Sequence, residues 1–208
     1  MNMNTLPKIS ILGLQGDIEE HFKILKTLET KLGTFRATIA KTKEEIENCN
    51  GIIIPGGEST TMNKLIEYYD LFDTIKNVPC ILGTCAGAIL LAKKVHNAKP
   101  WQKFLGLVDI EIERNAYGTQ TDSFSESTEI LLGDQKQTIT ATFIRAPIIR
   151  DFWGCAKPIS QLSNSTPIAI EQQTTNRFFL ALTFHPELET DIVHKYFITK
   201  CTTISIRD

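Results

Sequence analysis

The sequence predicts a single α/β domain in which helices cover both faces of a central, mostly parallel β-sheet. In the first half of the chain, short apolar runs alternate with segments whose apolar residues recur at helical spacing, and this order builds parallel sheets. The 208 residues are 42% hydrophobic and 22% charged, which is typical of a globular domain with a sizeable core. No internal repeat, low-complexity tract or linker divides residues 1–208.

The first half of the chain is predicted to contain four buried strands, because four short apolar runs are bounded by glycine, proline or polar residues. They cover residues 8–15, 35–40, 51–55 and 80–83. Helices are predicted between and after these strands, mainly where apolar residues recur every three or four positions. They cover residues 18–32, 43–48, 61–77 and 86–95. Asp17 stands at the N-cap position of the first helix, and Gly33 at its C-cap position.

The second half of the chain is richer in strand signals than in helical ones. Predicted strands cover residues 108–113, 138–144, 167–171 and 178–184. A last helix is predicted at residues 190–201, and the polar stretch 118–133 is predicted to be a loop. Strands are therefore expected in addition to those of the parallel core.

Charge and hydropathy exclude several classes of partner. The chain has 22 basic and 24 acidic side chains, a formal net charge of -2, and no basic run that would bind a nucleic-acid backbone. Its apolar stretches are far shorter than the roughly 20 residues of a membrane span. The N-terminal residues MNMNTLPK lack the apolar core of a signal peptide. We therefore expect a cytoplasmic protein without nucleic-acid or membrane partners.

The five cysteines suggest neither a disulfide framework nor a metal site. Their number is odd, and their spacing fits no zinc motif. Disulfides are also improbable in a chain of this size without a signal peptide. Four of the cysteines are expected to be small buried hydrophobic residues: Cys49, Cys80, Cys155 and Cys201.

The fifth cysteine lies in the sequence Gly83-Thr84-Cys85-Ala86-Gly87, where a predicted strand runs directly into a predicted helix. Flanking glycines permit a tight turn that holds the sulfur clear of the sheet edge. The helix N-terminus favours a thiolate, and the N–H of Ala86 would point toward an oxyanion formed beside the sulfur. The pattern predicts a nucleophile, although a passive cysteine in a glycine-rich turn explains this segment alone equally well.

A thiol nucleophile needs a base, and only four histidines are available. Three of them have a simpler explanation. His21 and His194 fall on predicted helices and are expected at the surface or in packing, while His96 suits a helix end near two lysines. His185 remains as the candidate base.

His185 belongs to the segment His185-Pro186-Glu187, which follows the predicted strand 178–184. The carboxyl ends of parallel strands gather at one edge of a sheet, where ligands bind, and Cys85 also lies at such an end. Glu187 can bond the second imidazole nitrogen and fix its tautomer, while Pro186 stiffens the connection. Alone, this segment is equally well an ordinary turn, but together with the cysteine turn it indicates a catalytic triad.

A third turn, Pro55-Gly56-Gly57-Glu58-Ser59, follows the predicted strand 51–55. Paired glycines let the backbone approach a reacting carbonyl closely, so this turn would provide a second oxyanion donor beside Ala86. Ser59 is expected to cap the next helix, a role that is compatible with ligand binding.

Three motifs in this order resemble class I (triad-type) glutamine amidotransferases. They are PGGEST at residues 55–60, GTCAGAILLA at residues 83–92 and FHPE at residues 184–187. Further segments resemble one subfamily, the glutaminase subunits of pyridoxal 5′-phosphate synthase. They are LGLQG at residues 12–16, ERNAYGTQTDSF at residues 113–124 and FIRAP at residues 143–147. The resemblance covers residues 8–197, and it implies a flavodoxin-like sheet with additional antiparallel strands.

The resemblance also implies a role for individual residues. Cys85 is similar to the family nucleophile, His185 to its base and acid, and Glu187 to the residue that orients the base. Backbone N–H groups of Gly57 and Ala86 would form the oxyanion hole. The positions that match glutamine-binding residues are Gly57, Glu58, Ser59, Arg114, Ile144 and Arg145. An arginine suits the α-carboxylate of a free amino acid, and an acidic or backbone acceptor suits its α-ammonium group.

The implied reaction is hydrolysis of L-glutamine to L-glutamate and ammonia through a Cys85 glutamyl thioester, without a metal or organic cofactor. The implied partner is a synthase subunit, a (β/α)8 barrel that assembles as a dodecamer, in a twelve-to-twelve complex that receives the ammonia internally. Such glutaminases are poorly active alone. One explanation is a Gly56-Gly57 peptide whose carbonyl points inward until docking flips it.

Three alternatives remain open. The chain could serve a different synthase as its glutaminase, but the ERN and FIRAP segments argue against this. It could be a related hydrolase such as a γ-glutamyl peptidase. It could also be a non-catalytic subunit that stabilises a synthase, although binding alone would not require Cys85, His185 and Glu187 together.

Overall fold

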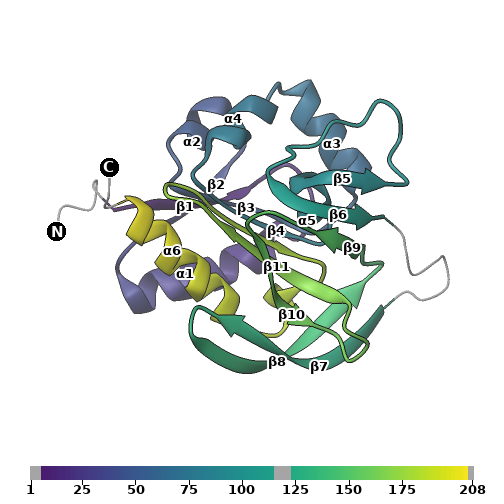
Figure 1. The fold of residues 1–208 in the computed structure, drawn as a ribbon. Coiled ribbons are helices and arrows are strands. Elements are labelled where there is room, and N and C mark those ends of the chain that lie inside the picture. The colour runs from purple at the N-terminus through teal and green to yellow at the C-terminus, as the bar shows by residue number, and fades with distance from the viewer. Residues whose placement is uncertain (1–5, 115–122, 206–208) are drawn as a thin grey trace.

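The computed structural model describes residues 6–114 and 123–205, which form a large mixed sheet between two layers of helices (Figure 1). Five of its strands are β1 (Lys8–Leu12), β2 (Arg36–Ala40), β3 (Gly51–Ile54), β4 (Cys80–Thr84) and β12 (Phe178–Leu182). They pair in parallel, in the spatial order β2, β1, β3, β4 and β12. The predicted parallel core is confirmed.

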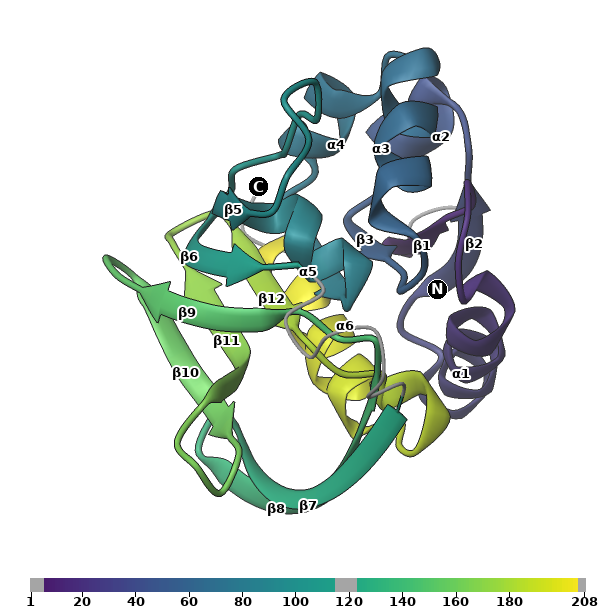
Figure 2. The ribbon, with the colours of Figure 1, turned by 90° about the vertical axis from the view of Figure 1, so that its right-hand side faces the viewer.

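Antiparallel strands extend this sheet beyond β12. They are β11 (Pro167–Gln173), β10 (Ala156–Gln161), β7 (Ser123–Leu132) and β8 (Gln135–Ile144), in that spatial order. Strands β7 and β8 form a long curved hairpin at the edge (Figure 2). A separate sheet contains β5 (Ala92–His96), β6 (Val108–Glu113) and β9 (Ile148–Phe152).

Helices cover the two faces of the parallel half, and each face has its own hydrophobic core. Helices α1 (Ile18–Leu32) and α6 (Ile192–Ser205) cover one face. Helices α2 (Lys43–Glu47), α3 (Ser59–Tyr68), α4 (Phe72–Asn77) and α5 (Ala86–Leu91) cover the other. Neighbouring strand residues serve opposite cores: Ile53 packs toward α1 and α6, whereas Ile52 and Ile54 pack toward the other layer.

Two predicted helices are shorter than expected. The helix predicted at residues 61–77 is divided into α3 and α4, because the chain turns through Asp70, which has a φ of 52°. The helix predicted at residues 86–95 ends at Leu91, and the next five residues form β5. The carbonyls of Leu90 and Leu91 accept hydrogen bonds from the N–H groups of residues 105 and 107, so they are not available to continue the helix.

The loop predicted at residues 118–133 is wrong for residues 123–132, which form β7. This strand is polar because most of its side chains reach solvent, and its backbone is satisfied by a ten-residue ladder with β8. Residues 115–122 lie outside the described residues. Strands β9 and β10 were not predicted, since their sequences mix polar and apolar residues without clear alternation.

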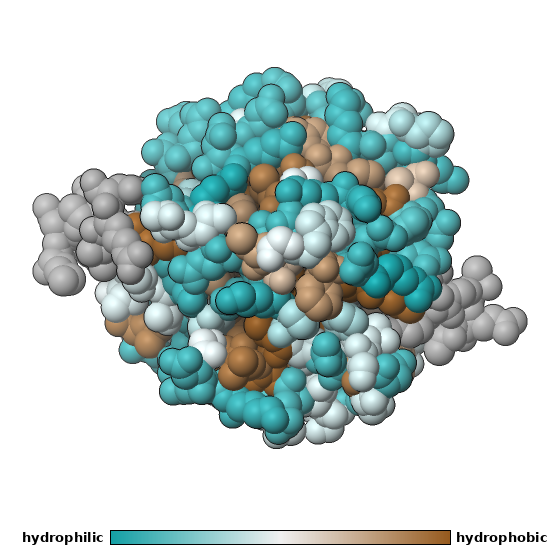
Figure 3. Space-filling view, viewed as in Figure 1, coloured by the Kyte–Doolittle hydropathy of each residue, from teal (hydrophilic) through white to brown (hydrophobic). Residues whose placement is uncertain are grey.

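The predicted C-cap of the first helix is confirmed. Gly33 ends α1 with a left-handed φ of 63° and donates its N–H to the carbonyl of Glu29. Of the four cysteines expected to be buried, Cys155 is instead exposed. No helix within the described ranges is long and apolar enough to cross a membrane. On the face shown in Figure 3, hydrophilic residues dominate and hydrophobic ones form separate patches.

Candidate active site

The carboxyl ends of β3, β4 and β12 lie side by side and lead into the three turns that the sequence singled out. Gly83 of β4 is paired with Ile54 of β3, and Thr84 of β4 is paired with Leu182 of β12. The glycine loop, Cys85 and the segment that contains His185 therefore leave the sheet at the same edge, as expected for parallel strands.

Cys85 connects β4 to α5 in a strained conformation. Its φ of 46° and ψ of -102° are unusual for a residue with a side chain. Its N–H donates a hydrogen bond of 2.8 Å to the carbonyl of Leu182, which fixes the turn against β12. Cys85 is 6% exposed, and its Sγ lies 3.9 Å from the carbonyl oxygen of Ile144. The turn thus presents the sulfur to a narrow opening, as a nucleophile requires.

His185 is buried and is held by two carboxylates. Its Nδ1 lies 2.7 Å from Oε1 of Glu187. Glu187 belongs to the short 3₁₀ helix Pro186–Leu188, which begins directly after the histidine. The same nitrogen lies 3.3 Å from Oδ2 of Asp17. With Nδ1 occupied in this way, Nε2 is the nitrogen available to Cys85. The arrangement matches a nucleophile, a base and an orienting acid.

The electrostatics of His185 favour its protonated form. Burial acts to lower the pKa of His185, but interactions with Asp17, Cys85 and Glu187 outweigh it and raise the pKa to about 12. Burial raises the pKa of Glu187, and the hydrogen bond from His185 opposes that rise only in part. These interactions stabilise the imidazolium that forms when His185 takes the proton of Cys85, and an imidazolium is the partner that a thiolate needs.

The glycine loop packs directly against this histidine. A Cβ on Gly56 would overlap the His185 ring and crowd the Asp17 carboxylate, so only glycine fits there. The carbonyl of Gly56 accepts a hydrogen bond of 3.2 Å from the N–H of Asp17, at the start of α1. Gly57 has a φ of 147°, and the side chain of Gln15 lies against it. This glycine loop, residues 55–59, is therefore anchored to the N-terminal end of α1.

A cavity of about 340 Å³ opens over these groups, at the lower end of the roughly 300–1,000 Å³ that is usual for small-molecule sites. Eight of the ten predicted site residues line it: Gly57, Glu58, Ser59, Cys85, Arg114, Ile144, Arg145 and His185. Two residues that were not predicted, Asp17 and Ile89, complete its wall. The two other predicted residues, Ala86 and Glu187, are buried behind it.

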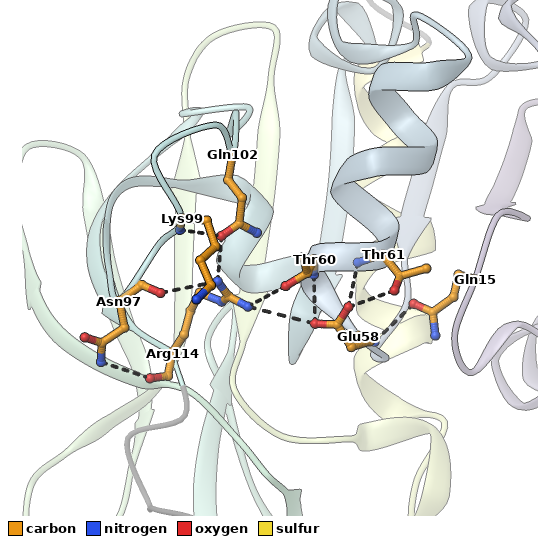
Figure 4. Close-up of polar contacts among 8 residues, drawn as sticks. All are labelled: Gln15, Glu58, Thr60, Thr61, Asn97, Lys99, Gln102 and Arg114. Carbon is orange, nitrogen blue, oxygen red and sulfur yellow. Dashed lines mark hydrogen bonds and ion pairs between the residues drawn. The ribbon is translucent and has the colours of Figure 1, made fainter.

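Arg114, the residue after β6, brings a positive charge to the lining of this cavity, and Figure 4 shows its polar contacts. It is only 6% exposed, and its guanidinium donates hydrogen bonds to three neutral acceptors: the Gln102 side chain at 2.6 Å, the Thr60 hydroxyl at 2.9 Å and the Asn97 carbonyl at 3.4 Å. Its Nε has no partner among the described residues. Among the described residues, the nearest carboxylate oxygen is in Glu58, 3.9 Å away. The charge is therefore held in place but only weakly neutralised.

Glu58 caps α3, a role that was predicted for Ser59. Its carboxylate accepts hydrogen bonds from the N–H groups of Thr60 and Thr61, at 3.0 and 2.6 Å (Figure 4). Burial acts to raise the pKa of Glu58, but these bonds outweigh it and lower the pKa to about 2. Ser59 is instead the first residue of the helix, because the acidic side chain is long enough to reach back to the free N–H groups.

Several residues of the site were not recognised from the sequence. Asp17 does not cap α1 with its side chain but turns toward His185. His21 and His194 are expected at the surface or in packing. Both are fully buried, as packing residues are, but the contact of His21 with Glu187 was not foreseen. The sequence does indicate that His21 is buried, because on a helical wheel it lies on the same face of α1 as Leu25 and Leu28. The motif residues 115–122 lie outside the described part of the chain.

Asp17, His185 and Glu187 are close enough together to hold a metal ion, since their ligand atoms lie within 4.8 Å of one another. However, Nδ1 of His185 lies 2.7 Å and 3.3 Å from oxygens of Glu187 and Asp17, contacts that favour a proton on this nitrogen, whereas a metal ligand must offer a lone pair. The donor set fits a triad better than a metal centre.

Residues 11–203 match the model of the SNO glutamine amidotransferase family. Among curated proteins, the chain is 40% identical to pyridoxal 5′-phosphate synthase subunit PdxT of Pyrococcus furiosus, covering 93% of this chain and 98% of that protein. It is 42% identical to the same subunit of Thermococcus kodakarensis, with the same coverage. A crystal structure described as a glutamine amidotransferase superimposes with a TM-score of 0.80 and 36% identity, over 93% of this chain and 98% of that one.

Proposed function

Because this chain belongs to the SNO glutamine amidotransferase family, we propose that Cys85, His185 and Glu187 are the triad through which it works. The protein is a glutaminase of the glutamine amidotransferase type, and it serves pyridoxal 5′-phosphate synthase in vitamin B6 biosynthesis. The observation that carries the assignment of the site is the placement of Cys85 and the His185–Glu187 pair on adjacent strand ends, under one cavity.

The proposed reaction is acyl transfer in two halves. His185 takes the proton of Cys85, and the thiolate attacks the side-chain carboxamide carbon of glutamine. When the tetrahedral intermediate collapses, the C–N bond breaks and His185 protonates the leaving nitrogen, which departs as ammonia. A water molecule, deprotonated by His185, then attacks the thioester and releases glutamate and the thiol. Glu187 keeps the imidazole oriented and stabilises its charge in both halves.

The oxyanion of each intermediate is assigned to two backbone N–H groups. Ala86 is the first residue of α5, so its N–H has no partner within the helix and is free to donate. Gly57 contributes the second N–H, from a loop that only glycine can form so close to the histidine. Together these donors would stabilise charge that exists only during the reaction.

The amino-acid end of glutamine is assigned to the opposite wall of the cavity. Arg114 offers a buried, weakly neutralised positive charge that suits the α-carboxylate. Glu58 stays ionised above a pH of about 2, and it suits the α-ammonium group. Ser59, Ile144 and Arg145 complete the substrate-binding wall. No metal ion or organic cofactor takes part.

Activation by the synthase is assigned to the Gly56-Gly57 peptide. Its carbonyl is held by the N–H of Asp17, and because the peptide is trans, the N–H of Gly57 points the opposite way. In the proposed activation, this peptide turns over so that the N–H of Gly57 faces the reacting carbonyl. The turn requires the bond between the Gly56 carbonyl and the N–H of Asp17 to break. A partner that contacts the start of α1 would therefore control the second oxyanion donor, whose absence lowers rates by about 10²-fold or more.

The partner is assigned as the barrel subunit of the synthase, in a twelve-to-twelve complex that receives ammonia internally. We place this assembly in the cytoplasm, without nucleic-acid or membrane partners. The near-neutral charge and the lack of a basic run in the sequence support the absence of a nucleic-acid partner.

Glutamine hydrolysis, measured with and without the synthase subunit, tests these assignments. We expect low activity alone, a large increase with the synthase, and complete loss in Cys85→Ala, while Cys155→Ala is unaffected because that exposed cysteine is outside the cavity. High activity of the isolated chain, unchanged by the synthase, would refute the activation step. Pyridoxal 5′-phosphate formation from glutamine by Cys85→Ala would favour a non-catalytic subunit.

A further inference from the structure

A pair of buried histidines lies directly behind the proposed triad. His21 comes from α1 and His194 from α6, and neither side chain reaches solvent. Nδ1 of His21 lies 2.8 Å from Nε2 of His194. The mechanism described above uses neither residue, so their close contact with the site calls for a physical explanation.

His21 faces the side of Glu187 that His185 does not use. Oε1 of Glu187 accepts the bond from His185, while Oε2 has no hydrogen bond of good geometry among the described residues. Nε2 of His21 lies 3.4 Å from Oε2. The same nitrogen lies 3.2 Å from the hydroxyl of Thr84, the residue before Cys85. His21 therefore touches both ends of the site, the acid and the turn of the nucleophile.

The contacts decide which nitrogen of His21 carries the proton. Burial, together with the neighbouring His194 and His185, keeps the pKa of His21 well below its ordinary value. Burial also lowers the pKa of His194 to about 3. Both rings are therefore neutral. If His194 donates from Nε2 to Nδ1 of His21, the proton of His21 is on Nε2 and points at Glu187 and Thr84. The reverse arrangement would aim a lone pair at a carboxylate oxygen. It would also leave a buried N–H at Nδ1 of His194, which has no partner among the described residues.

We propose that His21 is a positioning residue of the triad: its Nε2–H supports Oε2 of Glu187, and His194 fixes the tautomer that puts the proton there. A buried carboxylate with a single donor tends to take up a proton, whereas a second N–H favours the ionised form that orients His185. This inference rests on the proposed function, because it matters only if Glu187 orients His185 in catalysis.

Two polar substitutions distinguish the contribution of Nε2 of His21 from that of Nδ1. His21→Gln carries its amide nitrogen as many bonds from Cα as Nε2, so it keeps a donor near Glu187. His21→Asn carries its amide nitrogen as many bonds from Cα as Nδ1, so it keeps only the side that faces His194. His96→Asn is the matched control, since His96 is half exposed and pairs with Glu111 away from the cavity. Thermal unfolding of each variant reports its folding separately.

Glutamine hydrolysis in the complex with the synthase subunit gives kcat and KM for each variant. We expect His21→Asn to lower kcat by about 10-fold, the low end for a donor to a charged group, because the 3.4 Å contact is longer than a good hydrogen bond, with KM within about twofold. His21→Gln should retain kcat within about threefold, and His96→Asn should be unchanged. If His21→Asn is as active as the wild type, or if the two His21 variants lose kcat equally, the inference is wrong and the histidine pair only joins two helices.

A second measurement needs neither glutamine nor the synthase. Alkylation of Cys85 by iodoacetamide in the isolated chain reports the thiolate that His185 supports. It should slow in His21→Asn and be retained in His21→Gln, and equal rates in both variants would contradict the inference. If the wild-type complex does not hydrolyse glutamine at all, the proposed function fails, while the alkylation rates still decide whether His21 acts on the Cys85–His185 pair.

Discussion

Replacing Glu187 by glutamine should weaken the proposed triad without emptying the space behind it. The carboxylate lies 2.7 Å from Nδ1 of His185, and its side chain has no exposed surface. At an effective dielectric constant of about 20, the attraction between these charges is about 6 kcal/mol. Asp17 remains 3.3 Å from the same nitrogen but is more exposed, so it should replace roughly half of this attraction.

The expected loss for Glu187→Gln is therefore about 3 kcal/mol, or about 100-fold in kcat. The assay is glutamate release at saturating glutamine in the presence of the synthase subunit. Glu189→Gln is the control, because this acid lies two residues away and is exposed. The double variant Glu187→Gln with Asp17→Asn should lose about 10⁴-fold, since no carboxylate would then face the imidazolium. If the kcat of Glu187→Gln is within threefold of the wild-type value, the reasoning is refuted. If the kcat of the double variant is no lower than that of Glu187→Gln, Asp17 does not stabilise the imidazolium.

Three further outcomes follow from the geometry. Gly56→Ala should reduce glutamine hydrolysis at least tenfold, with circular dichroism unchanged, because its Cβ would displace His185; full activity would contradict the close packing. Arg114→Lys should raise the KM for glutamine more than tenfold while changing kcat less, because one ammonium cannot replace a guanidinium fork; an unchanged KM would move the α-carboxylate elsewhere. Glu58→Gln should lower the free energy of unfolding by about 1 kcal/mol at pH 7. The folded pKa of Glu58, about 2, is below the unfolded value, so this difference should be present above pH 4.5 and should disappear as the pH falls through about 2 in denaturant titrations.

The parallel core could be predicted because each of its strands is buried on both faces and is therefore apolar throughout. Residues Gly51–Ile54 illustrate this, with four buried side chains in a row. The strand β7 could not be predicted in the same way, because its polar sequence resembles a loop and only its pairing with β8 makes it a strand. The end of α5 at Leu91 was also hidden, since it depends on hydrogen bonds from residues 105 and 107.

The candidate site shows the same division between local and long-range information. Cys85 and His185 were recognised because their turns have a local logic, a strained strand end followed by a helix or a proline. Asp17 and His21 were missed because their roles depend on a helix that packs beside the site only in the folded chain. The sequence did show His21 on an otherwise apolar helix face. Such a pattern indicates that the histidine is buried but does not show which residue it contacts.

The pairing of β4 with β12 also has a consequence for how the molecule is assembled. One hundred residues separate Cys85 from His185 in the sequence, and 173 separate His21 from His194. During synthesis from the N-terminus, the nucleophile turn can be made long before the strand that delivers its base exists. Contacts of such long range form late, because closing a long loop costs entropy before any contact compensates for it. A nascent or truncated chain therefore carries Cys85 without His185, and the proposed triad is complete only after the last strand has paired with β4.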